Sequence, residues 1–241
     1  MHPSDVAVEE KEQVVEGTAE PDEAVEPSAT VEPDVNNVGK EKDEDDGCKL
    51  EVEEHHRHQM PSSDSGVYEG EYDGGGQRHG RGICLFPSGD KYDGTYENGL
   101  MHGTGVFKFA DGEMYEGQFY MGKCHGKGRY FFAGGDSYVG EFQDDYMHGK
   151  GVLQFADGEC YEGHFENELK NGYGEYKFAD GNVYEGNFKN DLMDGFGIMK
   201  FATGEVYKGD FKEDYMHGRG IIYYKDGTTR EDNWVFGKPV A

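Results

Sequence analysis

Histidine and carboxylate side chains, which can bind metals or carry protons, gather at two places in this chain. The first holds His55, His56 and His58, close to three glutamates. Such groups bind Zn²⁺ when a second ligand pair follows at a fixed spacing. No such pair accompanies this cluster, so we interpret it as a polar stretch without a metal.

A second set of histidines recurs directly before glycine. Its members are His79, His102, His125, His148 and His217. One interpretation is a proton-sensitive or metal-binding stripe. The other is that His, like Asn and Asp, tolerates the backbone of a turn before glycine. Asn171 and Asp194 take the same position in two copies, which favours the turn.

No other arrangement indicates catalysis. Glycine pairs such as Gly149 and Gly151 enter an extended segment, so no helix N-terminus is available to hold a phosphate. No Ser/His/Asp or Cys/His set stands apart from the repeating pattern of the chain. We therefore expect that this protein is not an enzyme, with no catalytic residue, no cofactor and no metal.

Most of these residues belong to a unit that recurs about every 23 positions from residue 68 to residue 227. The opening tyrosines are Tyr68, Tyr92, Tyr115, Tyr138, Tyr161, Tyr184 and Tyr207. The glycines two positions later are Gly70, Gly94, Gly117, Gly140, Gly163, Gly186 and Gly209. The aromatic residues four positions later are Tyr72, Tyr96, Phe119, Phe142, Phe165, Phe188 and Phe211. A fixed period of this kind indicates a repeat architecture.

Each unit predicts a β-hairpin. In Tyr115-Glu116-Gly117-Gln118-Phe119 the alternation places the aromatic residues and glycine on one face of a strand. A loop over residues 120–126 and a second strand over residues 128–132 complete the hairpin. An Asp-Gly turn, as at Asp111-Gly112, then reverses the chain into the next unit. The sequence therefore predicts an all-β fold, an elongated single-layer antiparallel β-meander.

Composition divides the chain into two parts. Residues 1–66 contain no aromatic side chain and hold 20 acidic against 5 basic residues, which predicts a disordered acidic N-terminal tail. Residues 67–241 hold 30 acidic and 18 basic residues and all the aromatic ones. They are expected to form one repeat domain of seven repeats and a degenerate C-terminal cap, in which Trp234 takes the aromatic position.

Charge and hydropathy restrict the partners and the location. The formal net charge is −27, which disfavours nucleic acid and makes direct binding to anionic membranes unlikely on sequence grounds. No apolar stretch approaches the ~18 residues of a membrane span. The start of the chain also lacks the apolar core of a secretory signal. We expect a cytoplasmic, cytoskeletal protein.

The pattern Tyr-Glu-Gly-x-Phe, followed by Met-His-Gly-x-Gly and a strand with a terminal Phe, resembles the MORN repeat (membrane occupation and recognition nexus). The first unit also resembles the radial spoke head protein 1 family of cilia and flagella. That likeness rests on Tyr68-Glu69-Gly70, the glycine-rich insert through Gly76, and residues 77–82 and 87–92. Unlike this chain, those proteins tend to carry their acidic segment after the repeats.

The resemblance implies a non-catalytic scaffold of the ciliary or flagellar axoneme, involved in motility and bound to other radial spoke head proteins. It also implies a homodimer, or a heterodimer with another MORN protein. The alternative is a MORN-type adaptor that links membranes to the cytoskeleton through lipid or membrane-protein contacts. A third possibility, a regulatory segment of an enzyme, is disfavoured because the chain ends at Ala241.

A column of apolar residues in the expected loops could bind the partner together with an exposed aromatic groove. Its members are Leu100, Met101, Tyr146, Met147, Leu192, Met193, Tyr215 and Met216. The alternative is that these side chains pack against adjacent repeats.

Overall fold

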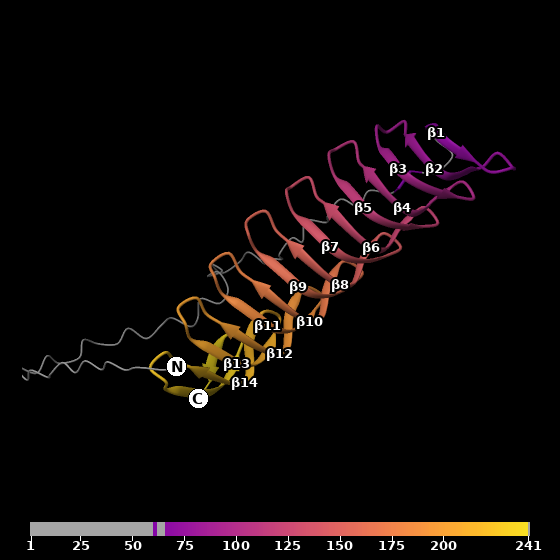
Figure 1. The fold of residues 1–241 in the computed structure, drawn as a ribbon. Helices are drawn as coiled ribbons and strands as arrows, with labels where there is room; N and C mark the ends of the chain where they lie inside the picture. The colour runs from indigo at the N-terminus through magenta and orange to yellow at the C-terminus, as the bar shows by residue number, and fades with distance from the viewer. Residues whose placement is uncertain (1–59, 62–65, 241) are drawn as a thin grey trace, which may run out of the picture. The chain divides into compact units, whose positions relative to one another are not determined.

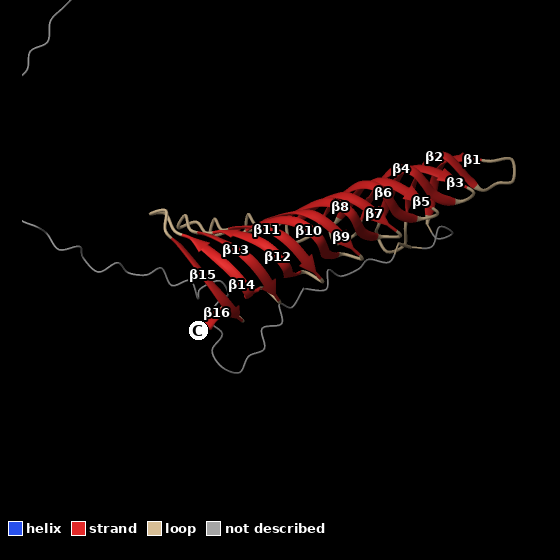
Figure 2. Ribbon diagram, turned by 90° about the horizontal axis from the view of Figure 1, so that it is seen from below, coloured by secondary structure: helices blue, strands red, loops and turns tan. Residues whose placement is uncertain are grey.

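The computed structural model describes residues 60–61 and 66–240. Apart from residues 60, 61 and 66, the predicted acidic tail lies outside the described residues, as does the histidine cluster at residues 55–58. The described chain forms sixteen strands in one antiparallel sheet, and each strand pairs with the next one in the sequence (Figure 1). In the described part there is no helix, and Figure 2 shows the strands as a single layer. The predicted all-β meander is confirmed.

The strands are numbered in chain order. The first eight are β1 (Val67–Tyr72), β2 (Arg78–Leu85), β3 (Lys91–Glu97), β4 (Leu100–Lys108), β5 (Met114–Tyr120), β6 (Lys123–Phe131), β7 (Ser137–Gln143) and β8 (Tyr146–Gln154). The others are β9 (Cys160–Glu166), β10 (Leu169–Lys177), β11 (Val183–Lys189), β12 (Leu192–Lys200), β13 (Val206–Lys212), β14 (Tyr215–Tyr223), β15 (Thr229–Val235) and β16 (Lys238–Val240).

In repeats two to seven, the two strands are joined by a turn of only two residues, whereas residues 73–77 join β1 to β2 in repeat one. Between β7 and β8 these are Asp144 (φ 51°) and Asp145 (φ 77°), a geometry that matches the right-handed twist of a hairpin. The predicted loop over residues 120–126 is therefore wrong. Only Met121 (φ 51°) and Gly122 (φ 85°) form the turn, and β6 already begins at Lys123.

The reversal between repeats is a three-residue turn. The Phe109 N–H donates to the Glu113 carbonyl (3.0 Å), and the Gly112 N–H donates to the Phe109 carbonyl (3.1 Å). Gly112 has a φ of 102°, as expected for the glycine of an Asp-Gly turn. This part of the turn prediction is confirmed.

The predicted loop failed because the second strand of each repeat contains a β-bulge. Gly117 pairs with Gly128 and Gln118 pairs with His125, so one step along β5 corresponds to three along β6. Gly126 takes the positive φ (64°) that the bulge requires. The Lys127 N–H at the bulge donates to Gln118 Oε1 (2.8 Å). The His-Gly pairs therefore lie at a bulge inside a strand and not in a turn.

A continuous row of glycines runs from β1 to β14, because the glycine of each of these strands pairs with that of the next, as Gly140 does with Gly128 and Gly151. The ring of Tyr138 lies over Gly140 and Gly151, where a methyl group on either would lie 2.5 Å from Tyr138 Cζ. The glycines therefore leave the space that the tyrosine fills, and the strands curve around the aromatic rings.

Hydrogen bonds also join successive repeats along both edges of the sheet. At the two-residue turns, the Met193 N–H donates to Asp214 Oδ1 (2.7 Å), while the Asp214 N–H donates to the Met193 carbonyl (3.1 Å). At the three-residue turns, the Ala156 N–H donates to Asp136 Oδ1 (2.8 Å). The acidic turn residues therefore stabilise the stacking of one repeat on the next.

Candidate interaction site

The face that carries the repeat tyrosines, here called the core face, is filled by aromatic rings. Tyr138 is fully buried, and its ring packs edge-on against Phe142 of its own repeat and Phe165 of the next, each 5.1 Å away. Its hydroxyl donates to the Glu141 carbonyl (2.9 Å). An exposed aromatic groove was predicted here. The structure buries the tyrosines that open repeats two to seven, and Met60 also packs against this core.

The tyrosines at this position share one environment. Burial is the main cause that raises the pKa of the hydroxyl in each of Tyr92, Tyr115, Tyr138, Tyr161, Tyr184 and Tyr207. A phenol in such a setting stays protonated and donates its hydrogen bond. These tyrosines are structural groups, because none reaches solvent from the core face.

The apolar column predicted from the sequence lies at the start of the second strand of each repeat. Met101, Met147, Met193 and Met216 are buried in the core. Leu100, Tyr146, Leu192 and Tyr215 are half-buried. The structure thus places the methionines against neighbouring repeats, where their side chains are not offered to a partner.

Lys170 occupies the position that Arg78 fills in repeat one and that Met or Cys fills in the remaining repeats. Its Nζ lies 4.9 Å from the ring centre of Tyr176 and 5.9 Å from that of Tyr161. Desolvation lowers the pKa of Lys170, while the carboxylates of Asp191 and Asp214 oppose the shift. The two aromatic faces partly replace the water that the ammonium group loses.

The histidine column lies beside the turns, where His79 is exposed and the other four histidines are half-buried. The His125 ring lies 5.6 Å from the Tyr120 ring, and His102 Nε2 lies 3.2 Å from Glu97 Oε2. Successive histidines are two strands apart, roughly 10 Å, which is too far to share a metal ion at bonds of about 2 Å. The structure therefore offers no support for a metal-binding stripe.

We expect His125→Asn to change the free energy of unfolding by less than about 0.5 kcal/mol, because Asn171 fills the same bulge position in repeat five. Chemical denaturation of the two proteins checks this result. His125→Ala is the companion variant, since it also removes the polar group. A large loss of stability in His125→Asn would show that the imidazole has a specific role.

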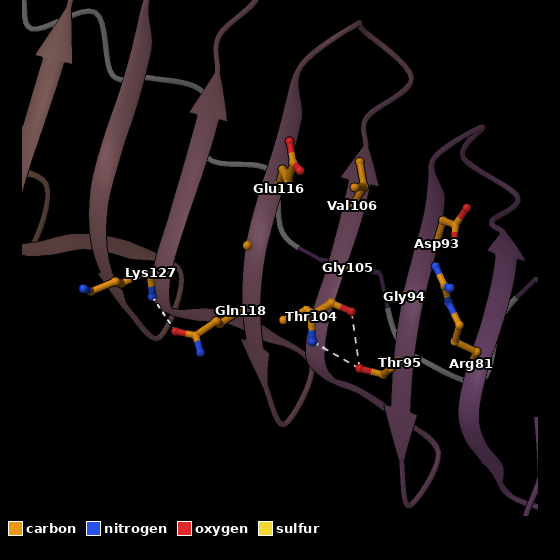
Figure 3. Close-up of a pocket in the computed structure, with 11 residues that line it drawn as sticks. Arg81, Asp93, Gly94, Thr95, Thr104, Gly105, Val106, Glu116, Gln118 and Lys127 are labelled. Carbon is orange, nitrogen blue, oxygen red and sulfur yellow. Dashed lines mark hydrogen bonds between the residues drawn. The ribbon is translucent and has the colours of Figure 1, made fainter.

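The opposite face, here called the outer face, is exposed and carries a shallow pocket of about 470 Å³ across β2 to β6 (Figure 3). Its charged side chains are Arg81, Asp93, Glu116 and Lys127. Two charges of each sign favour neither an anion nor a cation. Thr95 Oγ1 and Gln118 Oε1 already accept N–H groups at the bulges (3.1 and 2.8 Å), so they serve the fold.

Two exposed aromatic side chains on the outer face were missed by the sequence analysis. Tyr173 is 54% exposed and Phe196 is 56% exposed. Both directly follow the bulge glycine, in a slot that polar residues fill in the other repeats. The residues in this slot are Arg81, Thr104, Lys127, Lys150, Tyr173, Phe196 and Arg219. The change to aromatic residues is visible in the aligned repeats, but only the structure shows which face the slot occupies.

Other kinds of site receive no support from the described residues. Within residues 60–61 and 66–240, no three His, Cys, Asp or Glu side chains are grouped so that they could hold a metal ion. In the same part of the chain, no helix is long and apolar enough to span a membrane.

Comparison with known proteins links the repeat geometry to a family. A family model described as the MORN repeat matches seven consecutive segments, residues 68–91, 92–114, 115–137, 138–160, 161–183, 184–206 and 207–229. No curated protein matches the chain.

Solved structures show distant similarity. The TCP domain of Drosophila melanogaster SAS-4 (dCPAP), in complex with a proline-rich motif of Ana2 (dSTIL), is 12% identical with a TM-score of 0.44. That match covers 73% of this chain and 96% of the other. The TCP10 domain of Danio rerio CPAP, in complex with a peptide of Danio rerio STIL, is 16% identical with a TM-score of 0.30. It covers 69% of this chain and 84% of the other.

Proposed function

Because the chain belongs to the MORN repeat family, we propose that it is a non-catalytic scaffold that binds other proteins, as a component of the radial spoke head of the ciliary or flagellar axoneme. One observation supports the scaffold function. Seven in-register repeats form one continuous sheet, in which the side chains of the core face pack against each other and those of the outer face are exposed. The likeness of the first repeat to radial spoke head proteins supports the more specific assignment.

The repeat geometry supports this proposal in physical terms. The tyrosines that open repeats two to seven are buried on the core face, whereas the outer face, the turns and the two ends of the sheet expose side chains that a partner can contact. Adjacent repeats are joined by strand pairing, ring contacts and hydrogen bonds at both edges. Such an array holds several binding positions at fixed separations, which is what an assembly subunit requires.

The proposed partners are the other spoke-head subunits, and a second copy of the chain or another MORN protein as a dimer partner. The dimer is tested by sedimentation equilibrium at micromolar concentrations, where a mass equal to the monomer at every concentration would exclude it. Direct lipid contact is not part of the proposal, since the net charge of −27 opposes binding to anionic membranes.

The experiment that tests the location is fractionation of the tagged protein from flagellated cells. Detergent removes the membranes, and strong salt then extracts the axonemes. We expect the protein to remain with the axoneme after detergent and to leave with other spoke subunits in salt. Release by detergent would instead favour the adaptor that links membranes to the cytoskeleton.

A further inference from the structure

Repeats five and six differ from the other repeats on the outer face. Each has an exposed aromatic residue in the slot after the bulge glycine, Tyr173 on β10 and Phe196 on β12. The Tyr173 hydroxyl donates to Glu185 Oε1 (2.9 Å), but the fold does not require an aromatic ring in this slot, because Thr104 and Lys150 fill it in repeats two and four. Exposed aromatic side chains that the fold does not require indicate a contact surface.

The bulges of these two repeats also differ in their hydrogen bonds. In repeat one the Arg81 N–H donates to Glu71 Oε1 (3.0 Å), and Lys127 in repeat three has the matching bond to Gln118. In repeats five and six the facing side chains contact carbonyls. His164 Nδ1 lies 3.2 Å from the Tyr173 carbonyl, and Asn187 Nδ2 donates to the Phe196 carbonyl (3.1 Å). In both repeats the facing side chain therefore contacts the carbonyl of the slot residue, as Thr95 Oγ1 also does with the Thr104 carbonyl in repeat two (3.3 Å).

A row of carboxylates lies beside these rings on the outer face. Glu175 pairs across the sheet with Glu162 on β9 and with Glu185 on β11. Directly opposed like charges are unfavourable. Lys177 lies 3.0 Å from Glu175, and Lys200 lies 3.3 Å from Glu185. No Lys or Arg of the described chain lies within ion-pair distance of Glu162, so a cation from a partner would relieve this repulsion.

The distance between the two rings matches the repeat distance of one peptide conformation. Tyr173 and Phe196 are two strands apart with Asn187 between them, which corresponds to roughly 9.6 Å along the sheet. A polyproline II helix advances about 9.3 Å in each turn of three residues. A proline-rich segment that runs across the strands therefore places one proline over each ring. Such segments bind aromatic surfaces at a low entropic cost.

We propose that the outer face of repeats five and six binds a basic, proline-rich peptide segment in the polyproline II conformation, with prolines on Tyr173 and Phe196 and a Lys or Arg beside Glu162 and Glu175. This inference deepens the proposed scaffold function and rests on it. It names the chemistry of one partner at one position of the array.

The test is a titration of the full, ¹⁵N-labelled chain with three nine-residue peptides, followed by NMR. The probe contains three Arg-Pro-Pro triplets. One control, with three Arg-Gly-Ser triplets, keeps the charge and removes the stiff helix. The other, with three Glu-Pro-Pro triplets, keeps the helix and reverses the charge. We expect the probe to shift the amide signals around Tyr173 and Phe196, and both controls to bind at least about tenfold more weakly.

A double variant, Tyr173→Thr with Phe196→Thr, removes both rings and introduces the residue that repeat two has at Thr104. Its fold is checked by circular dichroism, and it should bind the probe at least about tenfold more weakly than the parent chain. Tyr120→Thr is the matched control, since Tyr120 is 53% exposed on β5, and it should bind normally. The amide shifts that the probe causes in the parent chain test the position of the site even if the double variant does not fold.

Three results would overturn the inference: no binding of the probe at millimolar concentration, equal binding of the Arg-Gly-Ser peptide, or signal changes that map away from repeats five and six. The axoneme fractionation does not depend on these peptides. If the peptide does not bind but the protein stays with the axoneme, only the proposed peptide site is rejected. If detergent releases the protein, the proposed spoke-head function is rejected.

Discussion

Gly163→Ala is expected to lower the free energy of unfolding by about 3 kcal/mol. The added methyl group would lie 2.5 Å from Tyr161 Cζ and 2.7 Å from Gly174 Cα. The tyrosine ring is enclosed by Phe165 and Phe188, so it cannot move aside, and Gly174 belongs to the paired strand. Urea denaturation followed by circular dichroism measures the loss.

The matched control is Gly134→Ala. Gly134 lies in the turn after β6, its φ is not positive, and a methyl group there would meet no atom within 4 Å. This variant should be neutral, or more stable by up to about 1 kcal/mol because the unfolded chain loses freedom. Hydrogen exchange adds a second test, since Gly163→Ala should expose the amides of β9 and β10 first. Equal stability of the two variants would contradict the role given to the glycine row.

The second large effect is unfolding at alkaline pH. The six tyrosines that open repeats two to seven, from Tyr92 to Tyr207, have pKa values raised above the ordinary 10.0, chiefly by burial. In the unfolded chain the same groups ionise near pH 10. The folded state therefore keeps protons that the unfolded state releases. The contribution of these tyrosines to the free energy of unfolding is fully present below about pH 10 and is lost as the pH rises toward the folded-state pKa values.

Six such groups make the transition steep. Each contributes about 1.4 kcal/mol per pH unit above pH 10, so together they remove up to roughly 8 kcal/mol per unit. We expect cooperative unfolding near about pH 11, with phenolate absorbance at 295 nm rising together with the loss of the β-sheet signal.

Tyr138→Phe is the informative variant for this transition. It removes one ionisable group and one hydrogen bond to the Glu141 carbonyl, so it should lose about 1 kcal/mol at pH 7 and show a shallower dependence on alkaline pH. Gradual ionisation of all 17 tyrosines near pH 10, with the sheet intact, would contradict the expectation.

The sequence predicted the repeat period, the strand that begins at each tyrosine and the reversal at Asp-Gly, because each depends on local alternation and on backbone preferences. It did not predict the bulge. The segment Cys124-His125-Gly126 has the polar and glycine composition of a loop, yet β6 runs through it because Gln118 satisfies the Lys127 N–H. That bond joins residues on two strands, which local propensity does not describe.

The candidate site was harder to predict than the fold. Met147 and Tyr173 are both apolar residues in polar surroundings of the sequence, but the first is 6% exposed and the second is 54% exposed. The difference is that Met147 belongs to the packed core, whereas Tyr173 lies on the exposed outer face. The exposed pair, Tyr173 and Phe196, can be found by comparing the repeats with one another. A packing residue such as the opening tyrosine keeps the same type in each repeat, whereas these two residues differ from the polar residues that the other repeats have in the same slot.

The pairing of every strand with its sequence neighbour has a mechanical consequence. Backbone hydrogen bonds between adjacent strands point along the long axis of the sheet. A pull on the two ends therefore loads these bonds one strand at a time, whereas a push compresses rings of successive repeats that are already in edge-to-face contact. The array is expected to transmit thrust as a strut and to peel under tension from whichever end is less firmly held.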